Sequence, residues 1–384
     1  MKNFLLLSVI LLLSTLCSCA VQPGSADFAS YAHLLKGKRV AVVANHTSMV
    51  GDSHLVDFLR SKNVDIRRIF CPEHGFRGTA DAGESVGSYT DKKTGLPVVS
   101  LYGKKKKPQQ EDLADIDVLI FDIQDIGVRF YTYLSTLHYV MESCAENSLP
   151  VIVMDRPNPH VSYVDGPVMQ KECMSFVGMH PVPIVYGMTI GEYARMINGE
   201  GWLKNAVQCD LTVIECKGWK RSMNYELTCK PSPNLPDKVS VMLYPSTCLF
   251  EGTVISEGRG TYTPFQIFGH PDLKDMPYHF IPKSIPGMSK SPKCLGKTCY
   301  GMDLRGEYGN VCSHKAIHLS WLITAYKAYL GKAPFFVPFF DKLAGTPKLK
   351  KDIIAGKSEQ EIKKSWIAEL NDFKKIRAKY LIYE

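Results

Sequence analysis

Short apolar runs recur along the first 220 residues and are separated by polar loops and amphipathic segments. The clearest runs lie within Arg39 to Asn45, Ile66 to Phe70, Pro97 to Leu101, Asp117 to Phe121, Val151 to Met154 and Asp210 to Glu215. Runs of this length are typical of strands buried on both faces of a parallel sheet. Between them, Asp52 to Ser61 and the segment from about Val128 carry apolar residues at helical spacing. The alternation predicts an α/β fold with a mostly parallel sheet.

The second half of the chain has a different pattern. Residues 270–312 show no clear period, whereas His314 to Leu330 and Ser358 to about Lys379 have helical periodicity. Pro231 to Pro236 is rigid and extended, as expected of a link between domains. A chain of 384 residues is long for one core. We therefore expect a first domain over residues 37–238 and a smaller α+β domain over residues 239–384.

The N-terminus has the pattern of an export signal. Met1-Lys2-Asn3 precedes the apolar run Phe4 to Leu13, which is too short to cross a bilayer. Leu16-Cys17-Ser18-Cys19 resembles a bacterial lipobox, in which Cys19 becomes the lipidated first residue; the alternative is a plain cleaved signal. We expect residues 1–19 to be the signal, residues 20–36 to be a tether, and the protein to be lipid-anchored in the cell envelope, facing the periplasm.

Composition narrows the range of partners. The net charge is +8, which suits anionic envelope polymers and lipid head groups. Lys104 to Lys107 is the one dense basic run, and a short lysine run is usually a solvated surface, so nucleic acid is not expected as a partner. Oligomeric state is not indicated by the sequence.

Cysteine usage and motif searches predict no metal and no cofactor. The chain has 12 cysteines but no CxxC pair, and Cys294 and Cys299 are close enough in sequence for a local bridge. No GxSxG elbow follows a predicted strand, because the GxSxG match at Gly83 to Gly87 lies in the polar, glycine-rich segment 79–95; no GxxxxGK[ST] or HExxH motif occurs. The sequence therefore does not indicate a serine hydrolase with a GxSxG elbow, a P-loop nucleotide-binding protein or an HExxH zinc protease.

Polar side chains follow the predicted strands at the point where each strand ends. They are Asn45, then Glu73 with His74 and Arg77, then Asp122 with Gln124 and Asp125, and then Asp155 with Arg156. The carboxyl ends of parallel strands share one edge of a sheet, and this is where ligands bind in open α/β folds. We expect these side chains to lie together there.

Glu73 is the candidate proton donor. It lies in Pro72-Glu73-His74-Gly75, between Phe70 and Phe76, and apolar neighbours favour the protonated form of a carboxyl group. A protonated carboxylic acid can give its proton to a leaving oxygen, as glycoside cleavage requires. The alternative is a structural ion pair with Arg77. His74 is expected to orient Glu73.

The second carboxylate is expected from Asp122 or Asp125, each of which could instead cap the following helix. Arg129 and Arg259 are candidates for holding a substrate carboxylate, because the guanidinium fork binds carboxylates with two hydrogen bonds. Asp155 and Arg156 are expected to pair with each other. Asn45, Arg77, Gln124, Tyr131, Asp155, Arg156 and Glu257 complete the predicted substrate-binding set.

Six blocks, in this order, resemble the exo-β-N-acetylmuramidase family of the NamZ type. The blocks begin at Cys71 (CPEHGFRG), Asp122 (DIQDIGVRFYTY), Asp155 (DRPNP), Tyr186 (YGMTIGE), Pro231 (PSPN) and Glu251 (EGT, with SEGRGT from Ser256). The resemblance runs from about Gly37 to the end. It implies a Rossmann-like N-terminal domain, a smaller C-terminal domain and a cleft between them. It also implies release of terminal N-acetylmuramic acid from the non-reducing end of peptidoglycan fragments, with Glu73 as the catalytic glutamate.

Two other functions fit the same residues. One is a peptidoglycan-binding lipoprotein without turnover, and the other is a metal-dependent esterase that uses His74, Asp122 and Asp125. For a glycosidase, the sequence leaves open whether the stereochemistry is retained or inverted, because that depends on carboxylate separation. It also leaves open whether the acetamido group of the substrate is the nucleophile.

Overall fold

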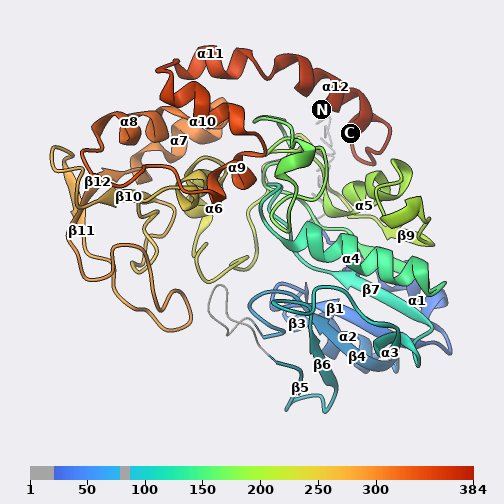
Figure 1. The fold of residues 1–384 in the computed structure, drawn as a ribbon. Helices are drawn as coiled ribbons and strands as arrows, with labels where there is room; N and C mark the ends of the chain where they lie inside the picture. The colour runs from blue at the N-terminus through green and yellow to red at the C-terminus, as the bar shows by residue number, and fades with distance from the viewer. Residues whose placement is uncertain (1–20, 78–86) are drawn as a thin grey trace, which may run out of the picture.

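The computed structural model describes residues 21–77 and 87–384, and its N-terminal part is built on a seven-stranded sheet of order β5-β6-β4-β1-β7-β8-β9 (Figure 1). The strands are β1 (Arg39–Ala44), β4 (Asp65–Cys71), β5 (Tyr89–Thr90), β6 (Pro97–Ser100), β7 (Val118–Asp122), β8 (Val151–Met154) and β9 (Leu211–Ile214). All neighbours pair in parallel except β5 with β6. The α/β fold with a mostly parallel sheet is as predicted.

Helices cover both faces of this sheet because every second residue of a strand points to the same face. Val40 and Val42 of β1 pack in one cluster with Tyr31 of α1 (Phe28–Leu35) and Leu55 of α2 (Leu55–Ser61). Ala41 and Val43 face the opposite cluster. That cluster also holds residues of α3 (Gln110–Leu113), α4 (Tyr133–Glu146) and α5 (Ile190–Gly199). A small hairpin, β2 (Met49–Val50) with β3 (Ser53–His54), precedes α2.

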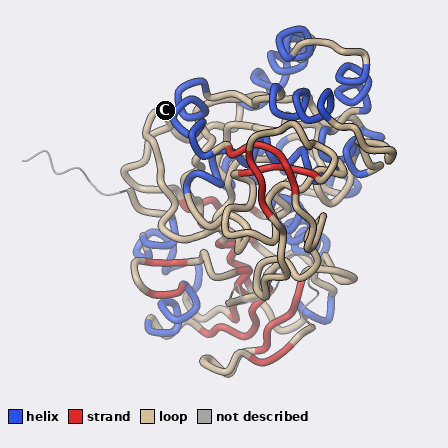
Figure 2. Tube along the Cα trace, turned by 90° about the vertical axis from the view of Figure 1, so that its left-hand side faces the viewer, coloured by secondary structure: helices blue, strands red, loops and turns tan. Residues whose placement is uncertain are grey.

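The C-terminal part is a smaller α+β unit. Its antiparallel sheet has the order β10-β12-β11 and is formed by β10 (Ile267–His270), β11 (Tyr278–Phe280) and β12 (Cys299–Asp303). The helices are α6 (Lys238–Thr247), α7 (Tyr308–His314), α8 (Ser320–Ala328), α9 (Phe339–Ala344), α10 (Pro347–Ile354), α11 (Glu359–Lys364) and α12 (Ile367–Ala378). Figure 2 shows this small sheet above the large one.

The two parts share one hydrophobic core, which runs from Ala41 of β1 to Phe373 of α12. In Figure 1, α12 turns back toward α5, and Arg377 donates to the carbonyl of Gly187 at 2.9 Å. Short 3-10 helices complete the fold: η1 (Gly24–Ala26), η2 (Lys171–Cys173), η3 (Lys204–Ala206), η4 (Cys248–Gly252) and η5 (Arg305–Glu307).

Several predicted segments differ from the structure. Residues 21–36, predicted to be a tether, are packed against the sheet, because Tyr31 and Leu35 lie on the buried side of α1. The helix predicted from Val128 begins only at Tyr133, since Val128 forms a β-bridge with Val185. The predicted helix from Ser358 to Lys379 is divided into α11 and α12, and the helix predicted from His314 to Leu330 is shortened to α8, because His314 is the last residue of α7.

The predicted signal and lipobox, with Cys19, lie outside the described residues. Within residues 21–77 and 87–384, no helix combines the length and the apolar character needed to cross a membrane.

Candidate functional site

The loop after β4 carries Glu73 at the carboxyl edge of the sheet. Pro72 ends the strand, and Gly75 closes a turn by donating its N–H to the carbonyl of Pro72 at 3.1 Å. His74 and Gly75 both have positive φ, of 69° and 74°. A left-handed histidine is a strained conformation of the kind that gathers at functional sites. The turn leaves Glu73 partly exposed while His74 and Phe76 are buried.

Tyr102, two residues beyond β6, lies against the Glu73 carboxylate. Its pKa is raised first by burial, then by the Glu73 charge, and then by the interaction of its hydroxyl with the Glu73 side chain. Because β6 lies next to β4, the two loops meet at the same edge of the sheet. Tyr102 was not among the predicted site residues, although it occupies the position that pointed to the others, directly after a strand.

Two tyrosines that follow β7, Tyr131 in the loop and Tyr133 as the first residue of α4, pack together near Glu73. The ring centroids of Tyr131 and Tyr133 are 4.7 Å apart. Burial raises the pKa of Tyr133, the contact with Tyr131 lowers it, and the negative charge of Glu73 raises it. Asn45, which follows β1, donates from Nδ2 to Tyr133 Oη at 2.9 Å. Residues that follow β1, β6 and β7 therefore gather near Glu73.

The predicted interdomain link closes this group from the other side. The carbonyl of Pro231 accepts from Tyr131 Oη at 2.7 Å, and that of Lys230 lies 2.8 Å from His46 Nε2. Ser232 Oγ lies 3.3 Å from His74 Nε2. The link is a fixed wall of the site, and His74 contacts it.

The C-terminal part contributes Arg259. Its guanidinium binds Glu251 at 2.6 Å and Glu257 at 3.4 Å, and lies 5.0 Å from the ring centroid of Phe265. The charges of Arg259 and Glu251 act on Tyr102, the same residue that lies against Glu73. Arg259 Nη1 has no hydrogen-bond partner among the described residues. This buried nitrogen lies in the C-terminal part, close to Tyr102 of the N-terminal part.

Asp122 and Arg156 form a buried ion pair rather than part of an open site. Arg156 Nε and Nη2 reach the two oxygens of Asp122 at 2.6 and 2.8 Å, and Asp122 is fully buried. Two predictions are thereby corrected. Asp122 cannot serve as the second catalytic carboxylate while the guanidinium occupies both its oxygens, and Arg156 pairs with Asp122 instead of Asp155.

Asp155 ties the C-terminus and α5 to the sheet. It accepts hydrogen bonds from Tyr383 Oη at 2.6 Å, Thr189 Oγ1 at 2.7 Å and the Gly191 N–H at 2.8 Å. It is fully buried, and burial raises its pKa to about 7. The structure therefore gives Asp155 and Arg156 structural roles in place of the predicted substrate binding.

Arg129 is also a structural residue. Its Nη1 donates to the carbonyls of Pro167 and Val182, and its Nη2 donates to those of Leu343 and Ala344, all within 2.9 Å. It is 2% exposed and joins the N-terminal part to α9. A guanidinium with four carbonyl partners has no fork left for a substrate carboxylate, so the prediction for Arg129 is corrected.

Asp125 lies below the tyrosines. Tyr186 Oη and the Gly127 N–H donate to its Oδ2, whereas its buried Oδ1 has no partner within the described part of the chain. Burial raises its pKa to about 6. The side chain of Gln124 is committed to the carbonyls of Asp125 and Pro157, at 2.8 and 2.7 Å. Both residues support the loop after β7 from within.

Arg77 forms an ion pair with Asp91 at 2.8 Å. This pair takes the place of the alternative ion pair between Arg77 and Glu73 that the sequence suggested. Glu257 is 2% exposed and bound by Lys293 at 3.0 Å as well as by Arg259. No cluster of three or more His, Cys, Asp or Glu side chains that could hold a metal ion is found in residues 21–77 and 87–384.

Comparison with known proteins identifies the family. The sequence model described as "Exo-beta-N-acetylmuramidase NamZ, N-terminal" matches residues 40–239, and the corresponding C-terminal model matches residues 242–383. The chain belongs to the exo-β-N-acetylmuramidase NamZ family. A β-N-acetylmuramidase is a glycoside hydrolase, so the predictions of family, fold class and enzyme class are confirmed.

The NamZ assignment extends to individual relatives. The chain is 42% identical over 374 residues to the peptidoglycan beta-N-acetylmuramidase NamZ of Bacillus subtilis (strain 168). The aligned region covers 92% of this chain and 89% of that protein. Two crystal structures of DUF1343 family proteins from Bacteroides fragilis NCTC 9343 superpose with TM-scores of 0.88 and 0.77, at 45% and 29% identity. Each covers 95% of this chain and 99% of the other.

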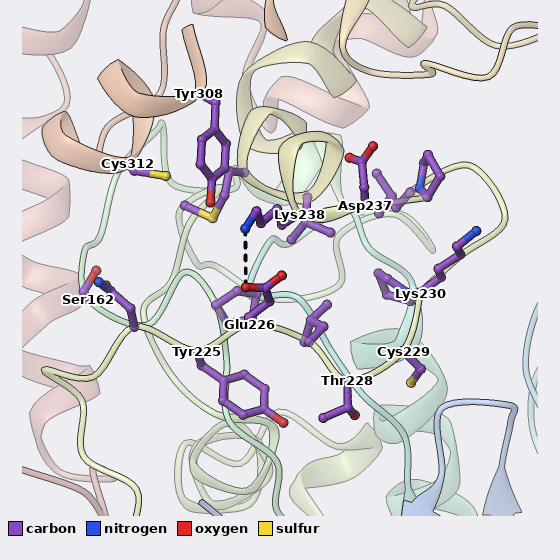
Figure 3. Close-up of a pocket in the computed structure, with 18 of the residues that line it drawn as sticks. Ser162, Tyr225, Glu226, Thr228, Cys229, Lys230, Asp237, Lys238, Tyr308 and Cys312 are labelled. Carbon is purple, nitrogen blue, oxygen red and sulfur yellow. Dashed lines mark ion pairs between the residues drawn. The ribbon is translucent and has the colours of Figure 1, made fainter. Parts of the chain in front are cut away.

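A cavity of about 690 Å³ lies beside the Glu73 group, bounded by the interdomain link, α6 and α7 (Figure 3). Figure 3 shows Tyr308 and the Lys238–Glu226 ion pair, 3.5 Å long, at this cavity. Pro231 is common to the cavity wall and to the tyrosine contact described above. The link therefore borders both the Glu73 group and this cavity.

Proposed function

We propose that this protein is an exo-β-N-acetylmuramidase. It releases terminal N-acetylmuramic acid from the non-reducing end of peptidoglycan-derived muramyl glycans during cell-wall turnover, and Glu73 donates the proton. The observation that carries the proposal is the position of Glu73. It is partly exposed at the carboxyl edge of the sheet, next to Tyr102, and placed where Arg259 approaches from the C-terminal part.

In the proposed reaction, Glu73 protonates the glycosidic oxygen as the bond to the anomeric carbon breaks. The leaving sugar then departs as a neutral alcohol instead of an alkoxide. The carbon is attacked by water or by the acetamido oxygen of the substrate. Both carboxylate oxygens of Asp122 are bound by Arg156, so Asp122 takes no part in the reaction. The anomeric form of the first product distinguishes the two routes, because direct attack by water inverts the configuration and a two-step route retains it.

We propose that Arg259 recognises the lactyl carboxylate of the muramyl residue. Its Nη1 is unpartnered among the described residues, whereas the opposite side of the guanidinium is held by Glu251. A guanidinium fixed by a carboxylate on one side keeps its orientation for a second carboxylate on the other. This contact would separate muramyl substrates from glucosaminyl ones.

The experiment that tests the activity compares two disaccharides of opposite order. The protein is incubated with N-acetylmuramyl-β-1,4-N-acetylglucosamine and, separately, with N-acetylglucosaminyl-β-1,4-N-acetylmuramic acid, and the products are identified by mass spectrometry. We expect free N-acetylmuramic acid from the first and no cleavage of the second. Cleavage of both at similar rates, or of neither, would contradict the proposed exo-muramidase.

We further propose that the protein is an exported lipoprotein of the cell envelope, lipid-anchored through Cys19 and facing the periplasm. The support is the pattern Met1-Lys2-Asn3, the apolar run to Leu13 and Leu16-Cys17-Ser18-Cys19. Intact mass of the membrane-extracted protein should show a lipid-modified N-terminal Cys19. The Cys19→Ala variant should keep its first 18 residues, and the same mass for both proteins would refute the anchor.

A further inference from the structure

The loop between β11 and β12, residues 281–298, is here called the strap. Lys293 of the strap donates from Nζ to Glu257 Oε2 at 3.0 Å and to the carbonyl of Phe250 at 2.8 Å. Lys283 donates its N–H to the carbonyl of Gly260 at 2.8 Å. Gly260 follows Arg259 in the chain, and Glu257 forms an ion pair with the Arg259 guanidinium. The strap therefore holds the segment that presents Arg259.

Two cysteines meet at the base of the strap. Cys294 is adjacent to Lys293, and Cys299 is the first residue of β12 and fully buried. The Lys297 N–H donates to the carbonyl of Cys294 at 3.0 Å, and this turn returns the chain toward Cys294. Cys294 packs against the small buried cluster that contains Cys299, so the two side chains lie close together.

The surroundings favour reaction at Cys294. The pKa of Cys294 is lowered first by the neighbouring Cys299 thiol, with further lowering from the His270 ring and the positive charge of Lys293. The thiolate is the form that attacks a disulfide. Cys294 is also the more exposed of the two residues, so an oxidant can reach it first.

We propose that Cys294 and Cys299 form an intramolecular disulfide that closes the base of the strap and fixes Lys293 on Glu257. The thiolate of Cys294 attacks one sulfur of a disulfide-bearing oxidant, such as oxidised glutathione, and releases the oxidant's other sulfur as a thiolate. Cys299, on losing its proton, then attacks the Cys294 sulfur of the mixed disulfide and releases the second glutathione thiolate. Two protein thiols are oxidised, and one glutathione disulfide is reduced.

The bond is tested on the full chain by mass spectrometry after incubation with oxidised glutathione and alkylation of the remaining thiols. Trypsin cuts after Lys293, Lys297 and Arg305, so the disulfide joins two peptides, residues 294–297 and residues 298–305. We expect this linked pair in the wild type and in Cys312→Ser, a control at another partly exposed cysteine. A reductant should abolish it, and Cys294→Ser should never form it.

Full alkylation of both thiols after oxidation would overturn the proposal, as would a stable glutathione adduct on Cys294 beside a free Cys299. Neither readout needs turnover, so the disulfide is judged independently of the proposed function.

The consequence for Arg259 rests on that function. Reduction should raise KM for a muramyl glycoside about threefold in the wild type and in Cys312→Ser, because the free energy of one partly exposed ion pair corresponds to about that factor. In Cys294→Ser, reduction should leave KM unchanged. A linked pair with unchanged KM would contradict the fixing of Lys293.

Discussion

The hydroxyl of Tyr102 faces the carboxylate of Glu73, and the two residues come from the ends of neighbouring strands. The contact explains how a glutamate on a short, strained turn keeps one orientation. It also brings the charges of Arg259 and Glu251, from the C-terminal part, close to the same tyrosine. The Glu73 group is therefore assembled from both parts of the chain.

Tyr102→Phe keeps the ring and removes the donor. We expect kcat to fall about tenfold or more with little change in KM, because a hydrogen bond to a charged group contributes about 1.5–3 kcal/mol and this one orients the proton donor. Tyr326→Phe, in α8 and packed on Phe335, is the matched control and should leave both constants unchanged. A Tyr102→Phe enzyme with wild-type kcat would show that Glu73 needs no such support.

Arg259→Lys keeps the charge and removes the fork. For a muramyl glycoside we expect kcat/KM to fall about 10- to 100-fold, since a charge-assisted hydrogen bond to the lactyl carboxylate is lost. For the matching N-acetylglucosaminyl glycoside, which lacks that carboxylate, the small residual rate should be unchanged. Arg305→Lys, whose arginine pairs with Asp303 on the surface, is the control. Equal losses on both glycosides would argue against lactyl recognition.

Asp122→Asn tests the buried ion pair. Removing one partner leaves the buried Arg156 uncompensated, and we expect the free energy of unfolding to fall by about 3–5 kcal/mol in denaturant titrations. Asp117→Asn breaks a partly exposed pair with Arg39 and should cost less than about 1 kcal/mol. Where Asp122→Asn is fully folded, its kcat should stay near that of the wild type. A large loss of kcat in folded protein would restore Asp122 as a catalytic candidate.

Asp125 makes stability depend on pH. Its pKa is about 6 in the folded protein, raised from 3.8 by burial, so the folded state holds the proton more tightly than the unfolded state. The stabilisation from this group is complete below about pH 4 and is lost as the pH rises through about 6, with an upper limit near 3 kcal/mol. The free energy of unfolding of the wild type minus that of Asp125→Asn should therefore fall between about pH 4.5 and about pH 7.5. A constant difference would contradict the raised pKa.

The sequence was sufficient for the six parallel strands of the large sheet because most of them are short apolar runs bounded by loop residues, as in Val118–Asp122 and Val151–Met154. It also placed Glu73 directly after a strand, since Pro72 and Gly75 mark where the strand ends. Helix boundaries were less certain. The segment after Val128 has helical spacing, but its backbone pairs with Val185, and only the tertiary fold supplies that partner.

Partners of charged side chains were the main error. Asp122 and Arg156 are far apart in sequence, and nothing in the local pattern distinguishes this pair from one between Asp155 and Arg156. Arg129 has the sequence context of a surface arginine, yet the α9 segment that covers it comes from the opposite end of the chain. Tyr102 was overlooked because a tyrosine carries no charge to draw notice, although it follows a predicted strand.

The most direct test of the central claim is the effect of Glu73→Gln on substrates with different leaving groups. If Glu73 protonates the departing oxygen, the variant should lose nearly all activity on a muramyl disaccharide, whose sugar alkoxide leaves poorly. It should keep much more activity on a 2,4-dinitrophenyl muramyl glycoside, whose phenolate needs no proton. Equal losses on both substrates in a folded Glu73→Gln protein would contradict proton donation by Glu73.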